Sequence, residues 1–179
     1  MSLLSANNYI EIQPFTSPCG ELLLGAYREQ LCLCDWVKQK HGQRNLHALQ
    51  ARFAASIEQR SSDILTRAAN QLTAYFAGER TAFDIPITYG IGTDFQQLVW
   101  SELRTIPYAA TISYSRLALR IGRPDAVRAV ANAVGANAIS IFVPCHRVVG
   151  KNGTLTGYAG GLSAKQYLLQ LEQNNTFNQ

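Results

Sequence analysis

The sequence predicts an α+β fold in two parts, a small antiparallel sheet with a helix followed by a mostly helical second half. Three observations lead to this prediction. Apolar runs of strand length fill much of residues 8–36, apolar residues at helical spacing fill residues 93–134, and Gly90 and Gly92 loosen the chain between them. We therefore expect a structural domain over residues 1–88 and a second, functional domain over residues 89–179, with 179 residues enough to bury a core.

Strands come first. Residues 21–27 and 30–36 predict two strands, because both are apolar and Arg28-Glu29 between them has the length of a hairpin turn. Residues 8–15 predict a third strand. From Ile64 the apolar residues take helical spacing, and Gly78 ends that helix. Pro86 then confines the extended segment around it to a sheet edge or a linker.

Helices dominate the second half. Thr93 and Gln96 form a capping-box pattern for a helix that Pro107 stops. Ser113 caps a short helix that runs to Gly122. Pro124 suits the first turn of a further helix over residues 125–134. The tight connection makes the last two helices a helix-turn-helix candidate, the alternative being an ordinary corner between two helices.

The last of these helices has a buried stripe and a second face of small residues. Val127, Val130, Ala131 and Val134 form the stripe. Ala126, Ala129 and Ala133 form the small face, with Arg128 among them. Small residues allow close approach to another surface, and a long arginine there could reach into a groove; a helix rich in alanine for its propensity alone is the alternative.

Residues 139–143 predict a short buried strand that ends at Pro144-Cys145-His146-Arg147. Asn152-Gly153 predicts a hairpin turn, and residues 157–161 predict a flexible glycine-rich loop. Ser163 with Gln166 predicts a capping box for a closing helix, followed by a frayed tail over residues 173–179.

Charge and cysteine content limit the function classes. The formal charge of +4 lies entirely in residues 92–179, which carry eight basic and four acidic residues. This asymmetry suggests a polyanionic partner, and a solvated basic surface is the alternative that the charge alone does not exclude. Four cysteines without a visible signal peptide predict reduced thiols and a cytoplasmic or nuclear protein, located with DNA in the nucleoid or the nucleus. No apolar run is long enough to span a membrane, so we expect no membrane partner.

Cys145 is the candidate nucleophile. His146 can take a thiol proton near neutral pH, and we expect Arg147 to lower the thiol pKa. Neighbouring strand residues point to opposite faces, so the pair needs an irregular backbone, which Pro144 favours, or a bridging water. The imidazole also needs an orienting carboxylate. Four acidic residues of the second half are candidates, and the pattern does not choose among them: Asp94, Glu102, Asp125 and Glu172.

Several motifs of the chain, in the order in which they occur, resemble those of one protein family. Residues 144–148, Pro-Cys-His-Arg-Val, resemble the active-site motif of the O6-alkylguanine-DNA alkyltransferases. The resemblance covers most of the chain and extends to the segments 17–22, 92–100, 112–114, 128–130 and 157–161, with Asn137 and Glu172. It implies a ribonuclease H-like N-terminal domain, no cofactor, and a monomer that acts once on double-stranded DNA containing O6-alkylguanine or O4-alkylthymine.

The resemblance also implies a role for each site residue. Cys145 is the nucleophile, His146 accepts its proton through a water, and Glu172 orients His146. Tyr114 donates to guanine N3, and Asn137 ties the recognition helix to the active-site turn. The carbonyls of Cys145 and Val148 accept from the exocyclic amine. Backbone N–H groups of Tyr158 and Ala159 hold O6. Arg128 replaces the flipped base in the minor groove, beside Ala126 and Ala129.

The sequence departs from the family's pattern at two places. Ala109-Ala110 stands where the family often has Gly-Glu, and Ala159 where some members have serine. Some members bind zinc in the N-terminal domain, but we expect no metal here, because Cys19, Cys32, Cys34, His41 and His47 lack compact zinc spacing.

Three alternative functions are a non-catalytic sensor of alkylated DNA, a cysteine hydrolase, and a transcription regulator. The presence of Cys145 argues against the sensor, and the motif at residues 144–147 argues against the regulator.

Overall fold

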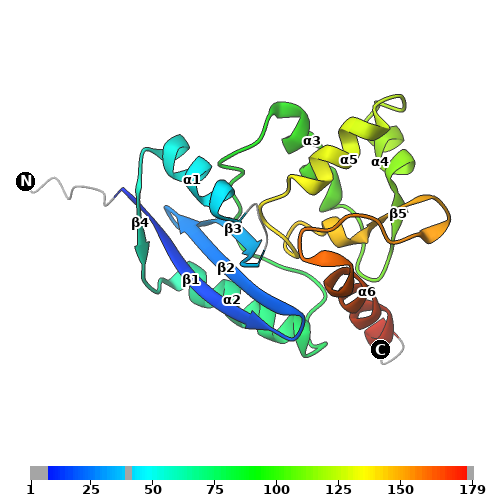
Figure 1. Cartoon of the computed structure of the whole chain (residues 1–179). Coiled ribbons are helices and arrows are strands. Elements are labelled where there is room, and N and C mark those ends of the chain that lie inside the picture. Colours follow the sequence, from blue (N-terminus) through cyan, green and yellow to red (C-terminus); the bar gives the residue numbers. More distant parts are fainter. Residues whose placement is uncertain (1–7, 39–41, 177–179) are drawn as a thin grey trace, which may run out of the picture.

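The computed structural model describes residues 8–38 and 42–176 and shows the predicted mixture of a small sheet and helices (Figure 1). Four strands form the sheet in the order β3-β2-β1-β4. β1 (Tyr9–Ser17), β2 (Gly20–Tyr27) and β3 (Gln30–Trp36) are antiparallel neighbours and confirm the three predicted strands. The fourth strand, β4 (Ser56–Gln59), pairs parallel to β1, so the sheet is mixed and not purely antiparallel.

The turn between β2 and β3 explains how a hairpin forms without Asn-Gly. Arg28 and Glu29 both have positive φ, 48° and 61°, which is the backbone that a two-residue turn of matching twist requires. Neither residue is a glycine, so the pairing of the two long strands fixes a conformation that is locally unfavourable.

Two helices cover opposite faces of the sheet. α2 (Asp63–Phe76) is the predicted helix and packs against Leu22 and Leu24 of β2. α1 (Gly42–Phe53), which the sequence analysis missed, packs against Ile10 and Leu33 on the other face. Beyond α2, the carbonyl of Pro86 accepts from the Leu31 N–H at 2.8 Å, so its segment lies along the β3 edge as predicted.

The second half contains four α-helices among its described residues: α3 (Asp94–Leu103), α4 (Tyr114–Arg120), α5 (Val127–Gly135) and α6 (Gly161–Thr176). The Thr93–Gln96 capping box is present at α3, and the Ser113 side chain accepts from the Arg116 N–H at the start of α4.

Two helix starts and one tail were wrong. α5 begins at Val127, because residues 123–126 form a separate turn in which Ala126 N–H donates to the Arg123 carbonyl, and Pro124 therefore lies outside the helix. α6 begins at Gly161, so Ser163 lies inside its first turn. α6 also continues to Thr176 where fraying was expected, and residues 177–179 lie outside the described part.

The predicted strand at residues 139–143 was also wrong. Ile139 and Ser140 make only isolated bridges, and Ile141 has φ 72°, which bends the chain sharply. Cys145–Arg147 then form a short 3-10 turn, η1, followed by β6 (Val148–Val149), which pairs parallel to β5 (Ile112–Ser113). A second 3-10 turn, η2 (Lys151–Gly153), contains the predicted Asn152-Gly153 pair, both with positive φ, but it is not flanked by paired strands.

The two halves share one core. The Cys34 N–H of β3 donates to the Ala138 carbonyl at 2.9 Å, and the Ser140 N–H donates back to the Cys34 carbonyl at 2.8 Å. Trp36 and Tyr75 from the first half belong to the same buried cluster as Cys145. Over residues 8–38 and 42–176, no helix has the length and apolar content to cross a membrane.

Candidate active site

Cys145 begins the η1 turn and is 5% exposed. Burial raises the pKa of its thiol to about 11, although the Asn137 side chain and the charge of Lys165 act in the opposite direction. The resting sulfur is therefore a protonated thiol at neutral pH, and it needs a base before it can attack. The irregular backbone expected at Pro144 is present, because the chain enters a 3-10 turn there instead of continuing as a strand.

Asn137 follows α5 and connects it to Cys145. Its Nδ2 donates to the Cys145 Sγ at 3.2 Å and to the Val143 carbonyl at 2.9 Å. Its Oδ1 accepts from the Ile139 N–H at 3.0 Å. The amide is thus held at both ends, which fixes the direction of the hydrogen bond to sulfur.

His146 and Glu172 form a fully buried pair. The His146 Nε2 lies 2.7 Å from the Glu172 Oε1, and both side chains have no exposed surface. Burial alone would raise the pKa of Glu172, but hydrogen bonds and charges from His146 and Arg147 outweigh it and hold the pKa at about 2. An ionised carboxylate only accepts, so Nε2 donates to it. Of the four open candidates for the orienting carboxylate, the structure brings Glu172 to His146.

The other ring nitrogen of His146 is available as a base. Nδ1 is buried and has no hydrogen-bond partner among the described residues. Burial lowers the pKa of His146 below its ordinary value, although the hydrogen bond that His146 donates to Glu172 acts in the opposite direction. The neutral ring therefore carries its proton on Nε2 and offers a lone pair on Nδ1, which is the state that a general base needs.

Arg147 does not act as the sequence analysis expected. Its Nη2 and Nε donate to the two oxygens of Glu172 at 2.9 and 3.0 Å, and its Nη1 donates to the Ile106 carbonyl at 2.7 Å. The 3-10 turn directs Arg147 toward the carboxylate, and the cation that lowers the pKa of the Cys145 thiol is Lys165. Arg147 therefore stabilises the charge of Glu172.

Sequence reasoning missed Lys165. Its side chain is fully buried, and Nζ donates to the Val148 carbonyl at 2.6 Å and to the Thr156 carbonyl at 2.9 Å. A signal was present, because Lys165, Leu168 and Glu172 share one face of α6 at helical spacing. The Val148 carbonyl, expected to accept from a base, already accepts from Lys165 and has one further lone pair.

Tyr114 is the first residue of α4 and directly follows β5. Its hydroxyl accepts a hydrogen bond from the Thr156 hydroxyl at 3.3 Å. Because the Thr156 carbonyl also accepts from Lys165, one residue joins the Tyr114 and Lys165 sides of the site.

The loop with Tyr158 and Ala159 rests on the first half of the molecule. The rings of Tyr158 and Trp36 meet edge to face at 5.9 Å, and a Cβ at Gly160 would lie 2.5 Å from the Trp36 ring. The Tyr158 ring lies 6.5 Å from the His146 ring. β3 therefore supports this loop beside His146.

α4 and α5 form the compact helix pair that was predicted. Arg128 and Ala129 are exposed on α5, and Ala126 is half-buried at its start. Ala133 does not belong to this small face, because it is buried and its carbonyl accepts from the Trp100 Nε1 at 2.7 Å. All five arginines between positions 104 and 128 are exposed, so this surface is basic.

In the part of the chain that the structure describes, no group of three or more potential metal ligands meets. Cys32 and Cys34 are buried free thiols, and burial raises the pKa of Cys32 to about 12. His41 lies outside the described residues.

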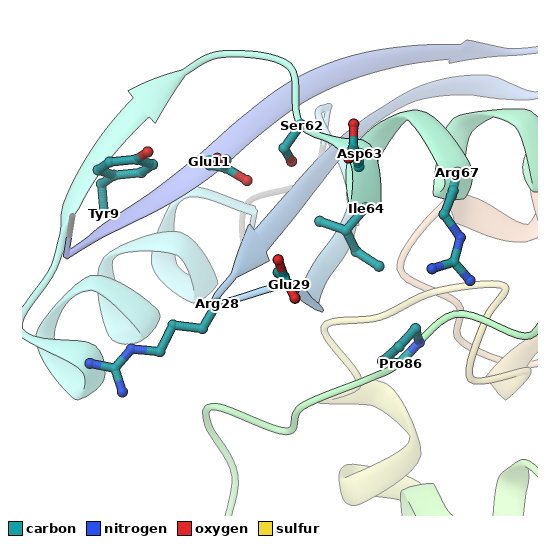
Figure 2. A pocket seen from close by; sticks show the side chains of 9 residues that line it. All are labelled: Tyr9, Glu11, Arg28, Glu29, Ser62, Asp63, Ile64, Arg67 and Pro86. Atoms are coloured by element: carbon teal, nitrogen blue, oxygen red, sulfur yellow. The ribbon is translucent and has the colours of Figure 1, made fainter. Parts of the chain in front are cut away.

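A cavity of about 740 Å³ lies in the first half and shares no lining residue with the Cys145 site (Figure 2). Figure 2 shows Glu11, Glu29 and Asp63 between Arg28 on one side and Arg67 on the other. The mixed charge of this cavity provides no set of groups that would activate a thiol.

Comparison with known proteins places both halves in one family. Residues 13–89 match the ribonuclease-like domain of 6-O-methylguanine DNA methyltransferase, and residues 94–174 match its DNA binding domain. A methylated-DNA–protein-cysteine methyltransferase of Mycobacterium tuberculosis is 43% identical over 167 residues, which cover 92% of this chain and 93% of that protein. The inducible enzyme of Bacillus subtilis is 50% identical over 122 residues, which cover 68% of each.

Solved structures agree. The crystal structure of M. tuberculosis O6-methylguanine methyltransferase is 41% identical, covers 93% of this chain and 94% of its own, and has a TM-score of 0.79. The structure of M. tuberculosis OGT in complex with DNA has a TM-score of 0.77 at the same identity and coverage. With the buried Cys145, His146 and Glu172 in one site and the helix pair beside it, this chain belongs to the methylated-DNA–protein-cysteine methyltransferase family.

Proposed function

We propose that this chain repairs DNA by transferring the alkyl group of O6-alkylguanine, and of O4-alkylthymine, irreversibly to Cys145. The observation that carries the proposal is the buried series of Cys145, His146 and Glu172, in which a protonated thiol lies beside a neutral histidine held by an ionised carboxylate. DNA is the partner, because the basic helix pair matches the family's DNA binding domain and a relative binds DNA.

The transfer balances without a cofactor. His146 Nδ1 takes the thiol proton through a water, and the thiolate attacks the alkyl carbon while the bond from that carbon to O6 breaks. Tyr114 supplies a proton toward guanine N3, so the base leaves without a full negative charge. The product is a thioether at Cys145, and since no group displaces it, each molecule acts once.

The base reaches Cys145 by leaving the stack. A sulfur that is 5% exposed cannot approach an atom inside a duplex, so the damaged nucleotide rotates out, at a cost of a few kcal/mol. Exposed Arg128 takes the vacated space from the minor groove, where Ala126 and Ala129 allow close approach. The chain acts as a monomer, with residues 1–88 as a supporting domain and 89–179 as the binding and transfer domain.

The remaining site residues bind the flipped base. The carbonyls of Cys145 and Val148 accept from its exocyclic amine, and the N–H groups of Tyr158 and Ala159 hold O6. Asn137 keeps the sulfur aligned with the recognition helix, through its bonds to Cys145 and Val143.

The test is a stoichiometric incubation with a duplex that contains one O6-methylguanine, followed by mass spectrometry of tryptic peptides. We expect one added methyl group on the peptide of residues 129–147, which holds Cys145 as its one cysteine, and unmodified guanine in the DNA. Tight binding without a mass change would show the alternative, a non-catalytic sensor of alkylated DNA. Absence of both binding and transfer would contradict both functions.

A further inference from the structure

Glu172 receives a hydrogen bond from the opposite half of the molecule. The hydroxyl of Tyr75, on α2, donates to the Glu172 Oε1 at 2.8 Å across a sequence separation of 97 residues. The same oxygen accepts from His146 at 2.7 Å and from Arg147 at 2.9 Å. Tyr75 is fully buried, so this donor does not exchange with solvent.

From this geometry we infer that Tyr75 is a positioning residue for alkyl transfer. Through Tyr75, the N-terminal half holds Glu172, and thereby His146, in the orientation that alkyl transfer requires. The inference rests on the proposed function, since it concerns the same site. It gives the first half a specific part in the chemistry beyond covering the core.

Tyr75 is itself well fixed. Its ring meets the ring of Tyr108 edge to face at 6.2 Å and contacts Phe83 at 5.4 Å. Burial and the neighbouring Glu172 raise the pKa of Tyr75 well above its ordinary value, so the hydroxyl keeps its proton and donates throughout the working pH range. A rigid donor of this kind fixes the rotation of the carboxylate, because the other oxygen is held by the Ala109 N–H at 3.0 Å.

The hydrogen bond also sets the basicity of the carboxylate. Each donor to Oε1 withdraws negative charge, so removing the Tyr75 hydroxyl leaves a more basic Glu172 that favours the protonated form of His146. The pKa of His146 would then rise, and less neutral base would be present at mildly acidic pH. The charged and titratable groups that face this pair are Tyr75, Tyr108, Cys145, Arg147, Tyr158 and Lys165.

Tyr75→Phe in the full chain is the test, with single-turnover transfer from an O6-methylguanine duplex followed over a series of pH values. We expect transfer about tenfold slower at neutral pH, in line with the loss of a hydrogen bond to a charged group, and an acidic limb of the rate profile shifted to higher pH. Tyr167→Phe is the matched control: Tyr167 lies on α6, its ring also meets α2 at Phe76, and no hydrogen bond joins its hydroxyl to Glu172 in the described structure.

Unchanged transfer by Tyr75→Phe, or slowing that is equal at every pH, would overturn the inference, because a packing role alone does not move the acidic limb. If this variant fails to fold, 3-fluorotyrosine at position 75 decides instead. It is a stronger donor and should shift the acidic limb to lower pH, and no shift would again overturn the inference. Absence of transfer by the unaltered chain would instead contradict the proposed function, so the two failures are distinguishable.

Discussion

The helices α2 and α6 meet where the two halves join, yet their buried faces differ in chemistry. The buried face of α2 is apolar at Ile64, Leu65, Ala68 and Leu72. The buried face of α6 contains Lys165 and Glu172, neither with any exposed surface. Burying charge costs stability unless hydrogen bonds and opposite charges satisfy it, and the partners of both residues on α6 do so.

This difference separates stability from chemistry within one core. Burial of an apolar face such as that of α2 stabilises the fold whatever its position in the molecule. The charged face of α6 is costly on its own, and its residues all lie beside Cys145 and His146. Changes on the charged face of α6 should therefore affect transfer before stability, and changes at the apolar positions of α2 the reverse, with Tyr75 as the exception on α2 because it donates to Glu172.

The largest expected effect is the loss of the nucleophile. Cys145→Ala should abolish alkyl transfer and keep binding to alkylated duplex, because the helix pair is untouched; transfer is measured on single-lesion duplex and binding by fluorescence anisotropy. Cys34→Ala is the matched control, since Cys34 is an equally buried free thiol of the first half, and it should keep transfer. Surviving transfer in Cys145→Ala would refute the site assignment.

Glu172→Gln should come next. The amide leaves Arg147 without its counter-ion and no longer holds His146 in the correct tautomer, so transfer should slow by about a thousandfold and stability fall by about 3 kcal/mol. Urea unfolding and single-turnover rates measure the two effects. Glu102→Gln is the control, because Glu102 pairs with Arg120 at 3.6 Å near the surface and should cost less than about 1 kcal/mol. Equal losses in both variants would remove the distinction between buried and surface carboxylates.

Lowering the pH should remove the contribution of Glu172 on α6 to the free energy of unfolding within a defined pH range. The pKa of Glu172 is about 2 in the folded state against an ordinary 4.5, so its contribution is complete above pH 4.5 and is lost as the pH falls toward 2. The lowered pKa of His146 also reduces the free energy of unfolding as the pH falls below 6.5, because the unfolded chain binds this proton more readily than the folded one. Unfolding free energy should fall by about 3 kcal/mol across the Glu172 window, and Glu172→Gln should flatten that part of the curve.

Arg128→Ala should affect duplex repair alone. The side chain is exposed on α5 and far from the buried charges, so we expect transfer from duplex to slow by about tenfold to a hundredfold, with reaction toward free O6-benzylguanine unchanged. Arg123→Ala, an exposed arginine just before α5, should show the smaller loss of a phosphate contact. If the variant reacts more slowly by the same factor with duplex and with free O6-benzylguanine, Arg128 does not assist base flipping.

The smallest effect should come from the contact between the halves at Gly160. Alanine there would place its Cβ 2.5 Å from the Trp36 ring, so we expect the loop to shift, stability to fall by about 1–2 kcal/mol, and transfer to slow a few-fold. Gly157→Ala is the control, because a Cβ at that position meets nothing within 4 Å. Thermal unfolding of the two variants would show whether Trp36 supports the loop, and identical melting temperatures would mean that it does not.

Local patterns predicted the elements whose residues repeat a clear period. The strands β1 to β3, the helix α2 and the Thr93 capping box all follow from spacing alone. α1 was missed although Leu46, Leu49 and Phe53 have helical spacing, because polar residues surround them. β4 has four mostly exposed residues, and its pairing with β1 decides its conformation.

The site was harder to predict because long-range contacts form it. The β-branched run at residues 139–143 predicts a strand, but a buried bend at Ile141 replaces it, since tertiary packing outweighs the cost of a positive φ. Spacing left four carboxylates open as partners of His146, and only the fold brings α6 to it. Lys165 was missed although it shares a face of α6 with Glu172, because that spacing shows the shared face and not the burial of the lysine. Tyr75 was missed because its contact with Glu172 spans 97 residues of sequence.

The separation between Tyr75, His146 and Glu172 has a consequence for synthesis. His146 and Glu172 are 26 residues apart, and Tyr75 precedes Glu172 by 97. Chains emerge from the ribosome N-terminus first, so Tyr75, Cys145 and His146 are all made before Glu172, which holds the histidine. Under the proposed transfer mechanism, the site is therefore complete only when α6 has been made and has docked against the first half.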